Sequence, residues 1–183
     1  SLTERTNRGV RSGEGDYTTT WTTDSDGYVI EVEYPRGNGV ETTLNSMKLP
    51  EEIRRKTDVS AANGTSDLVE EYDYDATRYY AVTRHEDAEG HETTYTVDTL
   101  GRCTQITHPT LTHVSPSVNV TELFAWNSDG TLDTRTDGEG VVTKFTYFTS
   151  GPRTGRLASR IVDHGTGNLN LTTSWDYEDW GDV

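Results

Sequence analysis

The feature that most constrains the fold of this chain is a short pattern that returns at a nearly constant spacing. Each copy has an aromatic residue, a second large residue or Thr two positions later, then Asp, Asn or Glu, two variable residues and Gly. Glycine at such a place predicts a tight turn with positive φ, which costs a residue with a Cβ atom about 1 kcal/mol or more. The clearest copies are WTTDSDG (21–27), YTVDTLG (95–101), FAWNSDG (124–130) and WDYEDWG (175–181).

Two further copies depart from the pattern. YDYDATR (72–78) has Arg78 in place of Gly, and FTYFTSGPRTG (145–155) has an insertion before Gly155. The corner positions then fall at 27, 78, 101, 130, 155 and 181, at intervals of 23 to 29 residues after a first gap of 51. This spacing predicts a repeat array over residues 17–183 with a degenerate unit or insertion at about 42–66. Residues 1–16 are expected to form an N-terminal strand or tail.

A second turn lies between successive corners. It occurs in YPRGNGVETT (34–43), HEDAEGHETTY (85–95), RTDGEGVVTKF (135–145) and VDHGTGNLNLTT (162–173), each followed by a Thr-rich stretch. Large residues alternate with polar ones between the turns, which is typical of strands. Because one hairpin is marginal alone, stacked neighbours complete the sheet. We therefore expect consecutive antiparallel hairpins of about 25 residues in one twisted, curved sheet, a segment of a spiral shell or solenoid.

Composition agrees with an all-β chain. The sequence has 32 Thr and 10 Tyr but only 31% hydrophobic residues, and β-branched and aromatic residues suit a pleated, half-buried surface. The best helical candidate is LPEEIRRK (49–56), where Pro50 is placed to start a single helical turn.

Charge and cysteine content exclude several classes of protein. A net charge of -15 argues against binding to a nucleic-acid backbone, which requires clustered Lys and Arg. The single cysteine, Cys103, excludes an internal disulfide framework. No apolar run approaches the roughly 18 residues of a membrane span. The chain begins and ends within the strand pattern, so we expect it to be a segment of a longer protein.

The repeat resembles the YD repeats of the RHS family. The resemblance rests on Tyr-x-Val-Asp-x-x-Gly-Arg at 95–102 and Thr-Gly-Arg-Leu at 154–157, and it covers most of residues 17–181. The family pattern is Tyr-Asp-x-x-Gly-Arg-Leu, and here Arg follows Gly only at Arg102 and Arg156. The resemblance implies an antiparallel sheet that spirals into a hollow shell, which in bacterial members encloses a C-terminal toxin. Related shells occur in insecticidal toxin complexes and in teneurin adhesion receptors. The self-cleaving Asp-Pro-x-Gly-Leu-like motif that ends an RHS core is absent here.

The histidines and acidic turns do not form a recognisable metal-site pattern. His108 and His113 flank PTLT without a Cys or carboxylate at ligand spacing, and His85, His91 and His164 lie in or beside turns. The turns DSDG (24–27) and DGEG (137–140) resemble parts of calcium loops but lack the 12-residue frame. We predict no metal and no cofactor.

The sequence contains no recognisable catalytic motif, but it has three possible glycosylation sites. Glu70, Glu71, Asp73 and Asp75 do not identify a glycosidase pair without a measured separation, and no nucleophile elbow occurs. Cys103 stands where the repeat has Leu, so we expect a small buried apolar residue. Three Asn-x-Thr acceptors, at residues 63–65, 119–121 and 170–172, would carry glycans in a host that glycosylates.

The residues that matter most for function are therefore predicted to have structural rather than catalytic roles. The predicted repeat corners are Gly27, Gly101, Gly130, Gly155 and Gly181, and the repeat aromatics are Trp21, Tyr72, Tyr95, Phe124, Phe145 and Trp175. These aromatics either pack across strands or form an exposed stripe that stacks on sugars.

We expect a non-enzymatic segment in the wall of a shell that encloses a C-terminal toxin or effector. An extracellular repeat-built adhesin or filament subunit is the first alternative, and a carbohydrate-binding β-protein is the second. The expected partners are further YD repeats of the same or another chain, an enclosed toxin cargo or surface glycans, with no nucleic acid. The expected location is extracellular or at the cell surface.

Overall fold

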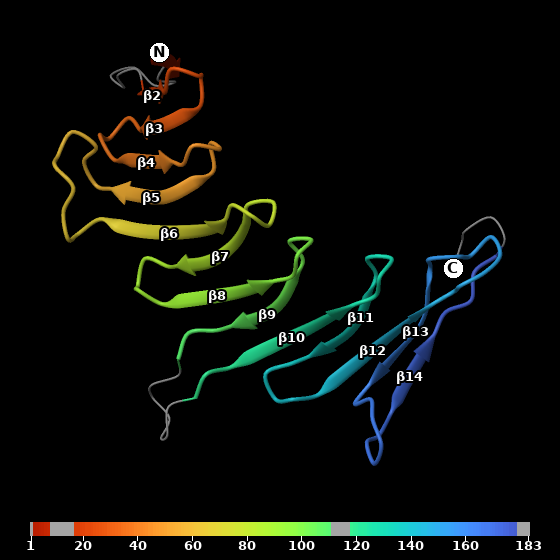
Figure 1. Cartoon of the computed structure of the whole chain (residues 1–183). Coiled ribbons are helices and arrows are strands. Elements are labelled where there is room, and N and C mark those ends of the chain that lie inside the picture. The colour runs from red at the N-terminus through yellow and green to blue at the C-terminus, as the bar shows by residue number, and fades with distance from the viewer. Residues whose placement is uncertain (1, 8–16, 111–117, 179–183) are drawn as a thin grey trace. The chain divides into compact units, whose positions relative to one another are not determined.

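The computed structural model describes residues 2–7, 17–110 and 118–178. These residues form fourteen β-strands, and the described part of the chain contains no helix. The strands are antiparallel and follow one another in the sheet in sequence order (Figure 1). The prediction of an all-β chain built from consecutive antiparallel hairpins in one sheet is confirmed. The strands are β1 (Leu2–Asn7), β2 (Tyr17–Thr23), β3 (Val29–Glu33), β4 (Gly39–Leu44), β5 (Pro50–Lys56), β6 (Leu68–Asp75), β7 (Ala81–Glu86), β8 (Glu92–Val97), β9 (Cys103–Thr107), β10 (Thr121–Trp126), β11 (Leu132–Thr136), β12 (Val142–Tyr147), β13 (Leu157–Val162) and β14 (Leu171–Ser174).

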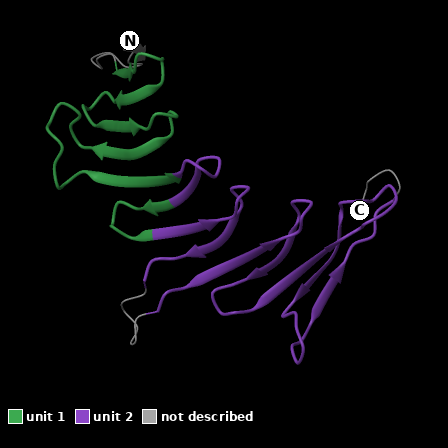
Figure 2. Ribbon diagram, viewed as in Figure 1, with its two compact units in different colours: residues 1–74, 84–92 green, residues 75–83, 93–183 purple. Residues whose placement is uncertain are grey.

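The chain divides into two compact units (Figure 2). Unit 1 contains residues 1–74 and 84–92, and unit 2 contains residues 75–83 and 93–183. Each unit repeats the same local plan, in which a strand, a tight corner and a return strand follow one another.

The corner between β8 and β9 shows how the sequence pattern makes a turn. The Oδ1 atom of Asp98 accepts the backbone N–H groups of Leu100 and Arg102 at 2.8 and 3.0 Å. The N–H of Gly101 reaches the Asp98 carbonyl at 3.0 Å, and Asp98 N–H reaches the Arg102 carbonyl at 2.9 Å. Gly101 has φ of 75°, so this is a turn closed by a left-handed glycine, and the strand register shifts by one residue beside it, at Thr96/Val97.

The same hydrogen bonds recur at both ends of the hairpins. An Asp or Asn side chain accepts the N–H groups two and four residues later at Asp24, Asn45, Asp87, Asp98 and Asp137. Such side-chain bonds copy a backbone turn, which is why Asp and Asn favour these positions. The corners and the second turns of the sequence pattern are therefore one structural motif.

The degenerate stretch at 42–66 contains a corner of this kind. Asn45 N–H bonds the Leu49 carbonyl at 2.9 Å, and Lys48 takes the position of the corner glycine with φ of 64°. The sequence pattern does not include this corner, because the pattern is defined by a glycine and this corner has a lysine in its place. The corner after β6 differs again, because Arg78 N–H reaches the Asp75 carbonyl at 3.1 Å while the positive φ angles fall on Tyr79 and Tyr80.

The best helical candidate of the sequence, at 49–56, forms strand β5 instead. Ile53 pairs with Thr42 on one side and with Glu70 on the other, so β5 is an interior strand. Pro50 stands at its first position, where a missing N–H leaves the hydrogen-bond ladder intact. In β5, Ile53 and Arg55 alternate with Glu52, Arg54 and Lys56, which is the two-residue period of a strand.

Burial is sparse because no second layer lies on the sheet in the described part of the chain. Among the described residues, only Gly39, Lys56 and Val97 are buried, and most side chains are half exposed. A sheet normally covers one face with another layer. The stability of each unit therefore depends on bonds within and between neighbouring hairpins.

Two corner glycines provide a test of this motif. A Cβ atom added at Gly101 would lie 2.8 Å from the Arg78 carbonyl oxygen, whereas one added at Gly130 would meet nothing within 4 Å. We expect Gly130→Ala to cost about 1 kcal/mol of unfolding free energy through its φ of 89° alone. Gly101→Ala adds overpacking and is expected to cost about 2 kcal/mol or more. Denaturant unfolding of both variants measures the difference, and equal losses would contradict the steric argument.

Candidate functional site: inter-repeat clasps and the aromatic face

Three aromatic side chains tie one repeat to the repeat before it. In each case the residue directly before a corner donates a side-chain hydrogen bond to a carbonyl five positions after the start of the preceding corner. We call these bonds inter-repeat clasps. They are Tyr74 Oη to Pro50 O (2.7 Å), Trp126 Nε1 to Cys103 O (2.7 Å) and Tyr147 Oη to Leu132 O (2.9 Å). The bond satisfies the polar tip of a large ring that is otherwise packed on the sheet.

Arg102 reinforces the clasp of Trp126. Its guanidinium lies over the Trp126 ring at 5.6 Å from the centroid and donates to the Asn127 carbonyl at 3.1 Å. Its Nε also donates to Asp98 at 2.7 Å. One side chain thus joins its own corner to the next corner along the chain. Cation–π contact of this kind contributes about 0.5–1 kcal/mol at exposed sites.

The second Gly-Arg of the sequence makes the same contact. The Arg156 guanidinium lies 5.3 Å from the centroid of the Tyr177 ring. In the corner at 148–156, Gly155 donates to the Phe148 carbonyl at 2.8 Å, so the insertion leaves the closing bond intact. The aromatic, acidic, glycine and arginine positions of the repeat therefore form one contact unit.

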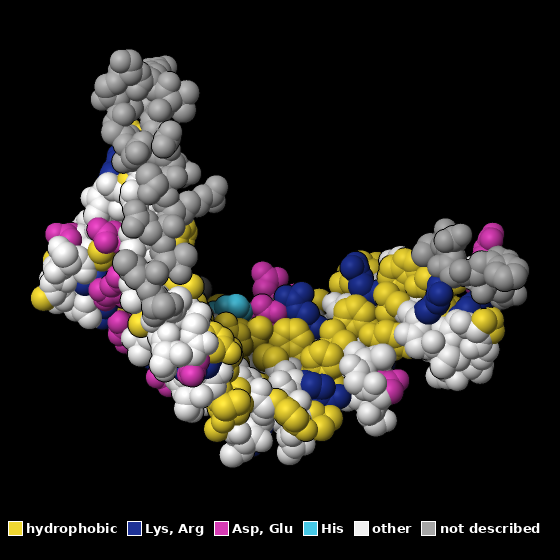
Figure 3. Space-filling model, turned by 90° about the horizontal axis from the view of Figure 1, so that it is seen from above, with side chains coloured by type: hydrophobic (Ala, Val, Ile, Leu, Met, Phe, Trp, Pro, Cys, Tyr) yellow, Lys and Arg dark blue, Asp and Glu magenta, His cyan; other side chains and the backbone are white. Residues whose placement is uncertain are grey.

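The repeat aromatics of unit 2 share one face of the sheet. Paired residues in an antiparallel sheet point to the same side. Ile106 pairs with Glu122, which lies two positions before Phe124. Arg135 pairs with Thr143, which lies two positions before Phe145. Hydrophobic side chains accordingly form a band on the face of unit 2 seen in Figure 3. The pairs on this face are Tyr95–Ile106, Phe124–Arg135 and Phe145–Arg160.

Unit 1 has a matching aromatic face. Trp21 pairs with Val32 and Val32 with Val40. Tyr72 lies two positions after Glu70, which pairs with Ile53, and its ring stacks on His85 with centroids 4.6 Å apart. Trp175 of unit 2 lies just after β14, where its N–H bonds the Ala158 carbonyl at 3.0 Å.

The corner glycines lie as follows. Positive φ angles occur at Gly27 (92°), Gly101 (75°), Gly130 (89°) and Gly155 (81°), whereas Gly181 lies outside the described residues. The corners place these glycines at hairpin ends, away from the aromatic face. Sequence reasoning missed the clasps themselves, although an aromatic residue directly before a corner, as at Tyr74, Trp126 and Tyr147, was their signal.

The opposite face of unit 1 is ionic. Arg84 bonds Glu92 at 2.8 Å and Glu71 at 3.3 Å, and it also pairs with Glu86. Arg55 pairs with Glu70 on the aromatic side, and this bond lowers the pKa of the Glu70 carboxyl. These pairs are largely exposed, so each contributes little to stability by itself.

The acidic residues considered for glycoside cleavage are occupied by other bonds. Glu71, Asp73 and Tyr72 line a groove of about 300 Å³, where Arg84 contacts both carboxylates. Asp75 accepts the Thr77 hydroxyl and N–H, which lower its pKa. A glycosidase acid requires a raised pKa instead. The geometry of these residues serves turns and ion pairs.

In the turn at 24–27, which resembles part of a calcium loop in sequence, the cation next to the carboxylates is the ammonium group of a lysine. Lys48 Nζ lies 2.7 Å from Asp24 and 2.5 Å from Asp26, and the hydrogen bond that Lys48 donates to Asp24 raises the pKa of Lys48. In the described part of the chain, no group of three His, Cys, Asp or Glu side chains is arranged to hold a metal. Nor does any helix of the described residues have the length and apolar character to cross a membrane.

The histidines have separate surroundings. His108 Nε2 lies 3.1 Å from Glu122, which also accepts Arg135 at 2.6 Å. His91 Nδ1 lies 3.2 Å from Asp87 in its own turn. His164 is in the turn after β13, and His113 lies outside the described residues. Cys103 is half-buried on β9, and this burial raises the pKa of its thiol, contrary to what a nucleophile requires.

Comparison with known proteins identifies the fold. No protein-family model matches the chain, and no curated protein matches it in sequence. Crystal structures of TcdB2-TccC3 align with 98% of this chain at a TM-score of 0.65 and, without the hypervariable C-terminal region, with 90% at 0.64. The Photorhabdus luminescens Tc holotoxin pore with a TccC3 variant aligns with 98% at 0.64.

Sequence identity is 12% in all three comparisons, so the likeness concerns the fold. The chain has the fold of a segment of these toxin-complex chains. It spans only 9–10% of their length. The expected resemblance to RHS-type shells is supported at the level of fold.

The clasps can be tested by removing one hydroxyl at a time. We expect Tyr147→Phe and Tyr74→Phe each to lower the free energy of unfolding by about 0.5–1.5 kcal/mol, because the carbonyl of the previous repeat loses its donor. Tyr17→Phe is the control, since Tyr17 is 49% exposed at the start of β2. Denaturant unfolding measures all three variants. Equal effects at Tyr147 and Tyr17 would show that the clasp contributes nothing.

The corner aspartates predict a pH dependence. Burial opposes ionisation of Asp98, but bonds from Arg102 and from backbone N–H groups outweigh it and lower the pKa of this carboxyl. A lowered folded-state pKa stabilises the fold above the unfolded value, near 3.9, and the gain is lost as pH falls through the folded value. Asp98→Asn keeps a side-chain oxygen but loses the charge. We expect its melting temperature to lie below that of the wild type at pH 7 and the gap to close on acidification toward pH 3. A gap independent of pH would contradict the assignment.

Proposed function

We propose that this chain is a non-catalytic segment in the wall of an RHS-type shell that encloses a C-terminal toxin or effector. The observation that carries the proposal is a one-layer antiparallel sheet with one aromatic face, in the fold of a segment of toxin-complex chains. Such a sheet suits a wall because its working parts are hydrogen-bonded hairpins and the clasps between them.

The aromatic face supports the same function. It carries half-exposed rings in both units, and the described residues place no second layer on it. A sheet with one apolar face requires something to bury that face. In a shell, this face would be directed at the enclosed chain and the ionic face at solvent. Further repeats of a longer protein, secreted or displayed at the cell surface, would extend the sheet.

A second candidate function is a repeat-built adhesin or filament. Strand β14 favours it, because all four residues Leu171–Ser174 are exposed and the strand pairs with β13 along one edge. An exposed edge is a template for pairing with a strand of another chain. In the shell, the same edge would instead receive the next hairpin.

The test uses the protein as its source produces it. We expect an intact mass several times that of this 20.4 kDa chain and a C-terminal fragment that resists protease until denaturant opens the wall. Intact mass, scattering during size exclusion and limited proteolysis measure these properties. A parent near 20.4 kDa that assembles end to end would overturn the shell and support the filament.

A further inference from the structure

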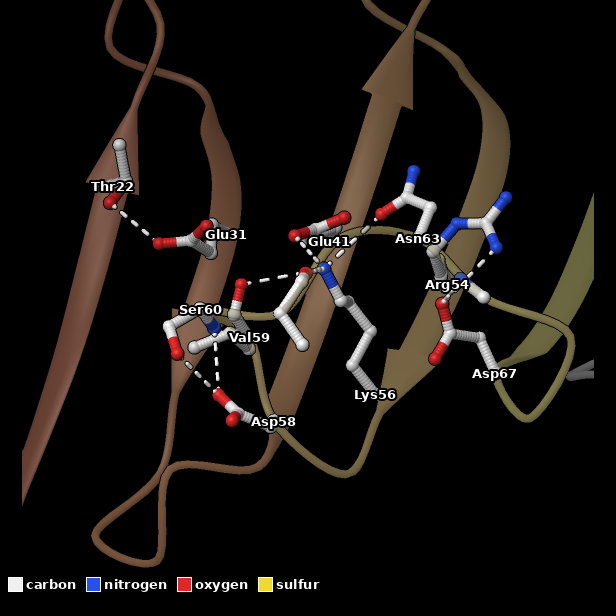
Figure 4. A network of polar contacts seen from close by, with 12 residues as sticks. Thr22, Glu31, Glu41, Arg54, Lys56, Asp58, Val59, Ser60, Asn63 and Asp67 are labelled. Carbon is white, nitrogen blue, oxygen red and sulfur yellow. Dashed lines mark hydrogen bonds and ion pairs between the residues drawn. The ribbon is translucent and has the colours of Figure 1, made fainter.

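The connection between β5 and β6 folds back over the polar face of the sheet in unit 1. We call residues 57–67 the strap (Figure 4). Val59 N–H bonds the Gly37 carbonyl at 2.9 Å. A Cβ atom on Gly39 would lie 2.7 Å from the Val59 Cγ1 atom, so the valine sits in the space that glycine leaves. The strap is thus docked onto the turn between β3 and β4.

The strap surrounds the ammonium group of Lys56. This side chain is only 3% exposed, and Figure 4 shows its Nζ atom between β4 and the strap. Ala61 O lies at 2.6 Å, Glu41 Oε1 at 2.9 Å, Asn63 Oδ1 at 3.1 Å and Val59 O at 3.4 Å. Three of these four oxygens come from the strap and one, with the negative charge, comes from β4.

Burial of an ammonium group is informative because it is unfavourable in free energy. Removing such an ion from water costs several kcal/mol unless oxygen atoms replace its hydration shell. Packing alone would be served by an apolar side chain of similar length. Carbonyl, amide and carboxylate oxygens are the ligands that hard cations take in proteins. The oxygens around Nζ therefore have the chemistry of a small-cation site.

We propose that these four oxygens form a binding site for a small monovalent cation, occupied by the Lys56 ammonium group itself. The strap closes on the polar face only while a cation is in the site. When Lys56 is shortened, the vacated site takes ammonium or a small primary ammonium ion.

The rest of the strap is held independently of this site. Asp67 accepts Gly64 N–H at 3.0 Å and Arg54 at 3.3 Å, and Asp58 accepts Ser60 N–H at 2.9 Å. The Asp67–Arg54 bond keeps the C-terminal end of the strap on β5, and the bond from Val59 N–H to the Gly37 carbonyl keeps its N-terminal part on the turn between β3 and β4. The oxygens therefore stay near their places, which is the condition for an added ion to restore closure.

The experiment is chemical rescue in the 183-residue chain. Lys56→Ala vacates the site, whereas Lys56→Met removes the charge but fills the space. Strap opening is measured by elastase, which cleaves after small residues such as Ala61, and unfolding by thermal melting. Each variant is compared in chloride salts of ammonium, methylammonium, sodium and tetramethylammonium at equal ionic strength.

We expect faster strap cleavage and a lower melting temperature for Lys56→Ala in sodium and tetramethylammonium salts. Ammonium or methylammonium at about ten times its Kd should slow cleavage about tenfold. Lys56→Met should show no rescue. If Lys56→Ala does not fold in the sodium salt, its refolding yield in the ammonium salt is measured in place of cleavage and melting.

Two outcomes would overturn the proposal. One is an equal response of Lys56→Ala to all four salts, since that would reduce the effect to ionic strength. The other is a Lys56→Met variant as stable and as resistant as the wild type, since the ammonium would then be replaceable by packing. Adding Asn63→Leu to Lys56→Ala removes one oxygen and should weaken the rescue, and undiminished rescue would place the ion elsewhere.

Discussion

The hydrogen bonds from backbone N–H groups to the corner Asp or Asn side chains fix the turns, and the turns set the register of the strands. The register then determines which side chains share a face of the sheet. Shifting a strand by one residue would move its aromatic side chains to the opposite face. In a domain with two layers, a buried core resists such a shift. Here nearly every described side chain remains partly exposed, so the turns must define the register locally. One-residue shifts occur at Thr96/Val97, Thr22/Thr23 and Ala125/Trp126, each directly before a corner, whereas the strands beside the second turns at 34–38 and 137–141 pair without a shift.

The clasps extend this local order from one repeat to the next. A hairpin corner fixes two strands, but it leaves the following hairpin free to tilt or slide. Trp126 and Arg102 connect the corner at Asn127 to the corner at Asp98, and Tyr147 connects β12 to the start of β11. Each bond is modest, yet in a one-dimensional array such bonds add nearest-neighbour stabilisation at each step where they occur. The dependence of each repeat on its neighbour is what a sheet without a second layer requires.

The fold was predictable from sequence because its signals are local. Glycine, aspartate and strand alternation all act within a few residues, so the hairpins and the antiparallel order follow from them. The corner at Lys48 was missed because its lysine adopts the left-handed conformation usually reserved for glycine. Strand β5 was mistaken for a possible helical turn because its period becomes readable only when the pairs Ile53–Thr42 and Ile53–Glu70 are known. The clasps and the Lys56 site join residues 3 to 24 positions apart through side-chain atoms, which no pattern of residue types specifies by itself.

The two faces of unit 1 differ in chemistry, and this difference supports the proposed wall. On the ionic face, exposed pairs such as Arg84 with Glu92 keep charges satisfied in contact with water, and the strap covers the one buried ammonium group. On the aromatic face, rings pack on neighbouring strands but stay half exposed, and they have no partner layer among the described residues. A sheet whose two sides both met bulk solvent would gain nothing from this separation. A sheet that divides an interior from an exterior would need it along its whole length.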